Sequence, residues 1–161
     1  ETGKIIKDLG AAAIDISGRG GTNFIDIELA RQGKEGAAFS DWGIPTAVAL
    51  IEVLAGTGSE IDIIASGGIN TVSSAVKALA LGAKAVGFAA LPLKLVMEKG
   101  LTEAINYFTG LMEDTKKCMA MLGAGNLEEL QKVPLVLTGE TREWLASRNI
   151  NLESITNRKR A

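Results

Sequence analysis

Short apolar runs recur along the chain, and each one stops at a loop of small residues. The runs are Ala11–Ile16, Ile61–Ala65 and Ala85–Ala89, and each is shorter than an ordinary helix. Apolar runs of this length that end at glycine or other small residues are typical of strands buried in a parallel sheet. The pattern therefore predicts three strands that belong to one such sheet.

Apolar residues at helical spacing lie between the predicted strands. One stripe falls within 47–54, after a start at Pro45 or Thr46, and a second falls within 72–80. Asn70 or Thr71 can cap the second helix, and Gly82 ends it as a C′ glycine does. Residues 61–89 therefore predict a strand–helix–strand unit, which favours the α/β class.

A longer stripe, 101–122, keeps one apolar face for about six turns and predicts a long helix. Asn126 and Glu129 then form a capping-box pattern for a short helix. An extended segment at 134–139 and a small helix at 140–147 follow. We expect residues 1–123 to form the main α/β unit, and 124–161 to be a helical extension packed on its outside. The basic tail, Arg158 to Arg160, is expected to be frayed and solvated.

Composition excludes several kinds of function. Hydrophobic residues make up 47% of the chain and charged residues 22%, and the formal net charge is −2, so we expect neither a nucleic-acid nor a membrane partner. The chain has one cysteine, Cys118, which rules out an internal disulfide and favours the cytoplasm. Histidine is absent, which excludes histidine-based catalysis within these residues. Because the first residue is not methionine, we expect a fragment of a longer protein.

The loops after the predicted strands carry the candidate chemistry, because ligands bind at the carboxyl ends of strands in parallel α/β folds. In SGGINT (66–71), the backbone N–H groups of Gly67, Gly68, Ile69 and Asn70 are expected to be free of partners at a helix N-terminus, which suits a phosphate. The small residues of 89–91 leave room for that anion. The alternative is a tight glycine turn without a ligand.

The loop SGRGGT (17–22) offers hydroxyl groups at Ser17 and Thr22 and a cationic donor at Arg19. These hydroxyls can instead cap local backbone. Together with the neighbouring phosphate site, the loop favours a phosphorylated ligand with a flat body. It has neither GxGxxG spacing nor a Walker lysine, so neither a Rossmann nor a P-loop site is supported. Asp15 and Asp62 lie inside strands and are not expected to be catalytic. Trp42 is expected to be a packing anchor.

Three segments together resemble the type II isopentenyl-diphosphate isomerases, namely IDISGRGGTNFIDIE, WGIPTAVALIEV and IIASGGINTVSSAVKALALGAKAVGFA. The resemblance covers essentially the whole chain, including PLVLTGETREWLASRNI near its end. It implies a (β/α)8 TIM barrel that binds FMN and interconverts isopentenyl and dimethylallyl diphosphates by proton transfer at the reduced flavin. It also implies NADPH as the reductant of the flavin, Mg²⁺ at the diphosphate substrate, and a homo-oligomer.

The resemblance assigns cofactor-binding roles to residues in the three loops. The residues that match FMN contacts of the family are Ser17, Thr22, Gly67, Gly68, Ile69, Asn70, Ala89 and Ala90. The family often has arginine where Asn70 stands, so only the backbone of Asn70 carries over.

A complete barrel has eight strands and about 250 residues, whereas this chain supplies roughly the last three βα units and the C-terminal helices. No catalytic or metal-binding residue is therefore assigned to it, and both are expected in an N-terminal part. The isolated chain should have little or no activity and weak affinity for FMN.

Two other functions remain open. One is another FMN-dependent TIM-barrel oxidoreductase, such as a 2-hydroxy-acid oxidase or a glutamate-synthase-like protein. Hydroxy-acid oxidases generally need a histidine base and an arginine in this region, and the absence of histidine and the presence of Thr22 after the glycine pair weigh against them. The other is a non-catalytic phosphate-binding barrel fragment or an assembly module, in which the apolar face of 101–122 would meet a partner.

Overall fold

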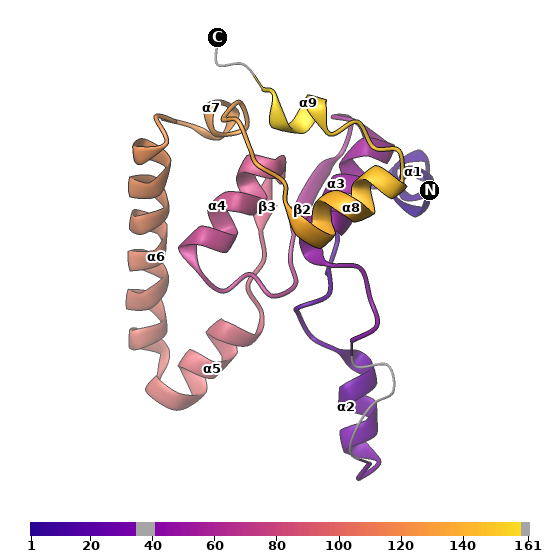
Figure 1. Ribbon diagram of the computed structural model, residues 1–161. Coiled ribbons are helices and arrows are strands. Elements are labelled where there is room, and N and C mark those ends of the chain that lie inside the picture. Colours follow the sequence, from indigo (N-terminus) through magenta and orange to yellow (C-terminus); the bar gives the residue numbers. More distant parts are fainter. Residues whose placement is uncertain (35–40, 159–161) are drawn as a thin grey trace.

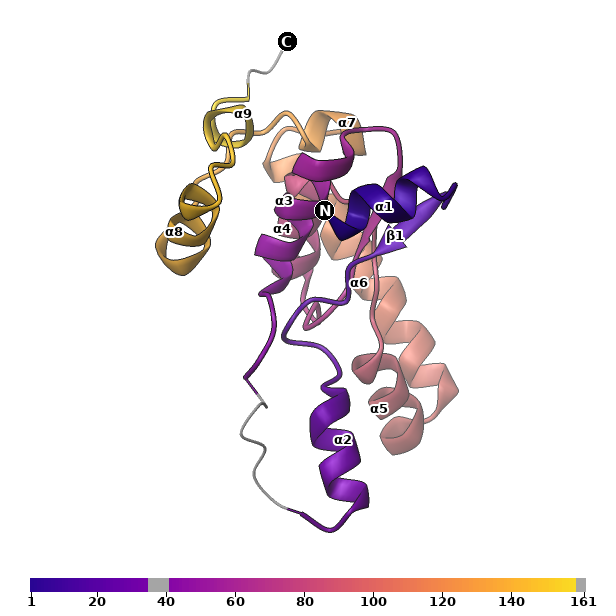
Figure 2. The ribbon, with the colours of Figure 1, turned by 90° about the vertical axis from the view of Figure 1, so that its right-hand side faces the viewer.

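A computed structural model describes residues 1–34 and 41–158. Its sheet has three parallel strands in the order β1-β2-β3; Figure 1 labels β2 and β3, and Figure 2 labels β1. The strands are β1 (Ala13–Asp15), β2 (Asp62–Ala65) and β3 (Ala85–Val86). Ala13 pairs with Asp62, and Ile64 pairs with Ala85. The three predicted strands are thus present, although each is shorter than its apolar run.

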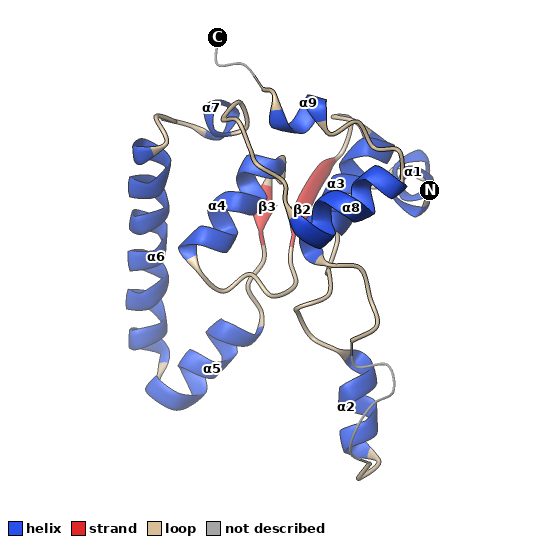
Figure 3. Ribbon diagram, viewed as in Figure 1, coloured by secondary structure: helices blue, strands red, loops and turns tan. Residues whose placement is uncertain are grey.

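Helices account for most of the remaining described chain (Figure 3). They are α1 (Thr2–Asp8), α2 (Phe24–Arg31), α3 (Thr46–Thr57), α4 (Val72–Leu81), α5 (Ala90–Lys99), α6 (Leu101–Met121), α7 (Leu127–Leu130), α8 (Gly139–Ser147) and α9 (Glu153–Thr156). The predicted helices appear as α3, α4, α6, α7 and α8. The sequence interpretation did not predict α1, α2, α5 and α9. Figure 2 shows α2 projecting away from the sheet.

One face of the sheet carries the core, and the other face lies open. Residues paired in a parallel register point to the same face, so the two sets of side chains follow from the pairing. Ile14, Ile63 and Ala65 point toward the helices and are buried in the main core. The side chains on the opposite face are those of Ala13, Asp15, Asp62, Ile64 and Ala85. Ile64 is half-buried, and the other four residues are exposed. Asp15 and Asp62 therefore share the uncovered face.

The strand–helix–strand unit is held by strong local signals at both ends of α4. Thr71 is the N-cap, and its hydroxyl accepts a hydrogen bond from the N–H of Ser74, whose own hydroxyl accepts from the N–H of Thr71. Gly82 ends the helix with a φ of 127°. Ala75 and Ala78 of α4 join the main core. Of the two predicted caps, Asn70 and Thr71, the structure has Thr71, and the predicted end at Gly82 is confirmed.

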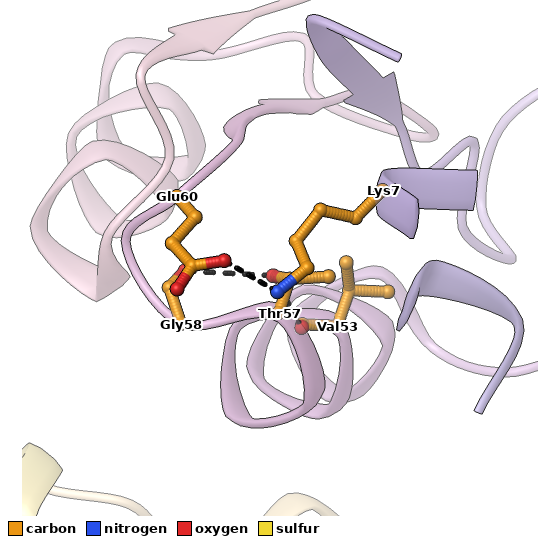
Figure 4. A network of polar contacts seen from close by, with 5 residues as sticks. All are labelled: Lys7, Val53, Thr57, Gly58 and Glu60. Atoms are coloured by element: carbon orange, nitrogen blue, oxygen red, sulfur yellow. Dashed lines mark hydrogen bonds and ion pairs between the residues drawn. The ribbon is translucent and has the colours of Figure 1, made fainter. Parts of the chain in front are cut away.

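Polar contacts tie α1 to the turn that precedes β2 (Figure 4). Lys7 Nζ lies 2.5 Å from Glu60 Oε2. Beside this pair, the hydroxyl of the buried residue Thr57 donates to the carbonyl oxygen of Val53 at 2.8 Å. Thr57 thus needs no partner outside its own helix, since a threonine hydroxyl can bond to the carbonyl one turn back.

The long helix α6 covers less than its sequence pattern predicts. Ala104 is buried where α6 packs against the rest of the protein. Leu101, Ile105 and Met112, in contrast, are between 57% and 65% exposed. An apolar strip along α6 is thus left uncovered. In the part of the chain that the structure describes, no helix has the length and the apolar character needed to cross a bilayer.

The C-terminal segment is attached to the main core. Leu145 and Ile155 are buried in the same cluster as the strands, and the Trp144 indole N–H donates to Glu52 Oε1 at 2.9 Å. Arg158 corrects the expectation of a frayed tail. Its guanidinium donates to the carbonyl oxygens of Ala80, Leu81 and Gln131, and burial lowers its pKa. The rest of the predicted tail, Lys159 and Arg160, lies outside the described residues, and the boundary between 123 and 124 stays a prediction.

Candidate functional site

The two glycine loops meet at the carboxyl ends of β1 and β2. We call residues 17–22 the first glycine loop and residues 66–71 the second glycine loop. The N–H of Gly18 donates to the carbonyl oxygen of Ser66 at 3.0 Å, so the parallel pairing continues past the strands into the loops. This contact brings together two segments that the sequence predicted at the same edge of the sheet.

The glycines of the two loops pack backbone against backbone. A Cβ atom on Gly67 would lie 2.1 Å from the carbonyl oxygen of Gly18, and one on Gly68 would lie 2.7 Å from that of Gly20. Gly67 and Gly68 also have φ values of 99° and 73°, which disfavour any other residue. Glycine is therefore required by the contact between the loops, whether or not a ligand also approaches them.

Thr46, the first residue of α3, contacts both glycine loops. Its hydroxyl lies 2.6 Å from the carbonyl oxygen of Gly67 and 3.2 Å from that of Arg19, and it shares its one hydrogen between them, with the shorter bond to Gly67. A Cβ on Gly18 would lie 2.4 Å from the Cα of Thr46. The helix start thus forms the third side of the contact between the loops.

Asp15 joins the loops from the uncovered face of the sheet. One carboxylate oxygen accepts hydrogen bonds from the Ser66 hydroxyl and, at 3.1 Å, from the N–H of Ser17. Ser17 has a φ of 39°, a conformation that a non-glycine residue adopts at a cost. Because the carboxylate holds the Ser17 N–H, it stabilises that turn.

Two expectations for this region are corrected. The sequence indicated Arg19 as a cationic donor on a bare loop, but its guanidinium donates to the carbonyl oxygen of Asp41 at 2.9 Å and lies 3.6 Å from a Glu140 carboxylate oxygen. It is therefore engaged by the protein. Trp42, expected as a packing anchor, has 78% of its surface exposed.

A cleft of about 940 Å³ lies beside the first glycine loop. Its walls come from α1, β1, the first glycine loop, the start of α2, residues 41–44 and α3. Ser17 and Thr22 both line it, and both are exposed. The candidate residues of the second glycine loop and of the start of α5 do not line it. The cleft thus brings together only part of the predicted site.

The second glycine loop presents backbone donors, as predicted for three of its four residues. Among the described residues, no acceptor takes the N–H groups of Gly67, Gly68 or Ile69. Asn70 differs, because its N–H donates to the Ser74 hydroxyl at 3.3 Å and is therefore not free. The Ile69 side chain is 7% exposed and packs in the main core, so it anchors the second glycine loop to the core.

The loop after β3 lies close to the second glycine loop at its first residue. A Cβ on Gly87 would lie 3.0 Å from the Cβ of Ser66. Ala89 is the N-cap of α5 and Ala90 is its first residue, so both lie where the first N–H groups of a helix lack intrahelical partners. The sequence did not predict α5, and it therefore missed this helix start.

Thr46 and Asp15 are the residues of this region whose contacts the sequence interpretation missed. Thr46 was assigned only a role in starting α3, and Asp15 none at all. A polar residue at the end of a strand, directly before a glycine loop, was the available signal for Asp15. Within residues 1–34 and 41–158, no group of three or more His, Cys, Asp or Glu side chains could hold a metal ion.

Known sequences give a consistent set of relatives. The chain is 41% identical over 151 residues to an isopentenyl-diphosphate delta-isomerase of Geobacillus sp. (strain WCH70). The aligned region covers 94% of this chain and 43% of that protein. It is 36% identical over 160 residues to the enzyme of the same name from Methanopyrus kandleri, covering 96% of this chain and 44% of that protein. The chain thus spans less than half the length of these relatives.

Solved structures resemble the fold at lower identity. A mandelate oxidase variant with a monooxide FMN adduct matches with a TM-score of 0.67 at 20% identity, over 85% of this chain and 38% of that one. A flavocytochrome b2 variant with benzoylformate matches with a TM-score of 0.53 at 19% identity, over 98% of this chain and 45% of that one. The family model described as FMN-dependent dehydrogenase matches residues 1–136. The chain belongs to this FMN-dependent dehydrogenase family.

Proposed function

We propose that this chain is the C-terminal portion of an FMN-dependent isopentenyl-diphosphate delta-isomerase, which converts isopentenyl diphosphate to dimethylallyl diphosphate. The observation that carries the proposal is the identity of 41% to the Geobacillus enzyme across 94% of the chain. The membership of the FMN-dependent dehydrogenase family supports the cofactor.

The open face of the sheet supports a (β/α)8 barrel. Parallel sheets ordinarily have both faces covered, yet Asp15 and Asp62 are exposed on one face here. In a barrel that face points to the interior, and consecutive strands lie side by side as β1, β2 and β3 do. The N-terminal part of the protein would supply the remaining strands, close the barrel and cover this face.

The described residues suit one side of a flavin site. The N–H groups of Gly67, Gly68 and Ile69 would bind the FMN phosphate, together with the backbone of Asn70 and the helix start at Ala89 and Ala90. Ser17 and Thr22 would contact the flavin from the first glycine loop. FMN, once reduced by NADPH, would supply the proton-transfer chemistry. The described acidic residues do not form a cation site, so binding of Mg²⁺ and the catalytic residues are proposed for the N-terminal part. We further propose a cytoplasmic homo-oligomer.

The test uses the full-length protein that contains this chain. It should bind FMN, seen as a shift in flavin absorbance, and NADPH should bleach that absorbance. With reduced flavin, it should convert isopentenyl diphosphate to dimethylallyl diphosphate. Absence of flavin binding by the full-length protein would overturn the proposal.

A second candidate is an FMN-dependent oxidase of 2-hydroxy acids, whose fold the mandelate oxidase structure represents, although the absence of histidine from the chain weighs against it. The same preparation distinguishes the two functions. Reduction of the flavin by mandelate or lactate, without isomerase activity, would support the oxidase. Reduction by NADPH with isomerase activity would support the first proposal.

A further inference from the structure

The hydroxyl of Thr46 fixes the direction of one peptide group in the second glycine loop. This hydroxyl donates to the carbonyl oxygen of Gly67 at 2.6 Å. In a planar trans peptide, the C=O and the following N–H point in opposite directions. The N–H of Gly68 must therefore point away from Thr46, and among the described residues no acceptor takes it.

This peptide group would not hold its direction on its own. It joins Gly67 and Gly68, whose φ values are 99° and 73°. Because glycine adopts positive and negative φ with similar ease, the peptide between two glycines can turn over at low cost. The packing against Gly18 and Gly20 limits movement of the loop as a whole, whereas the Thr46 hydroxyl selects the direction of the carbonyl.

We propose that Thr46 is a positioning residue for the FMN phosphate. By holding the Gly67 carbonyl, Thr46 keeps the Gly68 N–H turned toward the position of the phosphate. The carbonyl oxygen of Arg19 lies farther from the same hydroxyl, at 3.2 Å, so the Gly67 carbonyl is its main acceptor. The inference rests on the proposed function, since it takes FMN as the ligand of these loops.

The test compares affinities for FMN and for riboflavin, which lacks the phosphate, in the full-length protein. Thr46→Val keeps the shape of the side chain and removes the hydroxyl, and Thr46→Ser keeps the hydroxyl. Thr57→Val is the matched control, because the Thr57 hydroxyl bonds only to the carbonyl oxygens of Val53 and Gly58, at the end of α3 away from the loops. Flavin fluorescence gives the dissociation constants, and thermal melting reports folding.

We expect Thr46→Val to weaken FMN binding about tenfold, the effect of losing one oriented donor. Riboflavin binding should change by less than about twofold, so the preference for FMN falls. Thr46→Ser and Thr57→Val should keep that preference. If the valine variant does not fold, Thr46→Ala and Thr46→Ser give the same comparison, since they differ by one hydroxyl.

Retention of the wild-type preference for FMN by Thr46→Val or by Thr46→Ala would overturn the role of Thr46. An equal loss of both ligands would also overturn it, because a general weakening of the fold affects both. The wild-type titration tests the proposed function separately: a full-length protein that binds no FMN refutes that function, and the role of Thr46 with it.

Discussion

Gly67 touches the backbone of Gly18 so closely that a methyl group on Gly67 would lie 2.1 Å from the Gly18 carbonyl oxygen. The two residues follow different strands, and the sequence separates them widely. Their contact makes the two glycine loops one unit, so a change in one loop must displace the other.

Gly67→Ala should therefore damage stability and flavin binding together. The new methyl group meets backbone atoms that cannot move aside, and the φ of 99° disfavours alanine in addition. We expect a loss of roughly 3 kcal/mol in the free energy of unfolding, measured by urea denaturation of the full-length protein.

Gly110→Ala is the control for this variant. Gly110 lies inside α6, and a Cβ there meets nothing within 4 Å. Because alanine favours a helix over glycine, we expect it to raise stability by about 0.5–1 kcal/mol. Equal effects of the two substitutions would contradict the packing of the loops.

Thr22→Val should weaken FMN binding without lowering the melting temperature of the flavin-free protein. The Thr22 side chain is exposed and lines the cleft beside the first glycine loop, so its hydroxyl is expected to serve the ligand rather than the fold. We expect a loss of about tenfold in affinity. Thr102→Val, at the exposed start of α6, should have no effect. Unchanged affinity of the Thr22 variant would remove Thr22 from the site.

The isolated chain, residues 1–161, should bind FMN far more weakly than the full-length protein and show no isomerase activity. One face of its sheet is open, and the cleft takes in only part of the candidate site. Titration of both proteins with FMN, side by side, measures the difference. Activity of the isolated chain near that of the full-length protein would contradict the need for the N-terminal part.

The contribution of the Lys7–Glu60 pair to the stability of the folded protein should fall in acid and again at high pH. The hydrogen bond from Lys7, followed by its charge, lowers the pKa of Glu60 below the ordinary 4.5. Glu60 correspondingly raises the pKa of Lys7 above 10.5. The contribution is thus complete between those ordinary values. It is lost as the pH falls through the lowered pKa of Glu60, or rises through the raised pKa of Lys7.

Melting temperatures of Glu60→Gln, Lys7→Met and the double variant, measured across pH, test this dependence. The difference between wild type and Glu60→Gln should be small, because the pair is exposed, and should shrink in acid and in high salt. The coupling in the double-variant cycle should disappear under the same conditions. A coupling that grows in acid would contradict the assignment.

Arg158→Met should destabilise the protein, since the guanidinium holds three carbonyl oxygens at the ends of α4 and α7. Leaving these partly buried acceptors without a donor costs about 1–3 kcal/mol. Arg148→Met, which removes an exposed contact to one carboxylate oxygen, should cost less. Arg158→Lys should recover only part of the loss, because an ammonium cannot span the same acceptors. Denaturant midpoints of the three variants check this order.

The sequence predicted those parts of the fold whose signals are local. The cap at Thr71, the end of α4 at Gly82 and the three strands all follow from residues next to one another. The contacts of Thr46 and Arg158 were missed because each joins segments far apart in the chain. No periodicity in the sequence marks such a contact.

The candidate site was predicted to a similar extent. The position of both glycine loops at one edge of the sheet followed from the strand pattern. The reason for their glycines could not be predicted in the same way. Glycine is needed both where two loops approach each other closely and where a ligand approaches a loop, so the residue alone does not distinguish the two cases. The engagement of the Asn70 N–H was also missed, because the Ser74 hydroxyl that caps Thr71 accepts from the N–H of Asn70 as well.

The pairing of the strands has a consequence for the order in which this region folds. The segment between β2 and β3 holds only α4 and its turns, whereas α2 and α3 both lie between β1 and β2. Closing the shorter loop costs less chain entropy, and the well-capped α4 brings its strand ends together. We therefore expect β2, α4 and β3 to form the folding nucleus, onto which β1 and the first glycine loop assemble late.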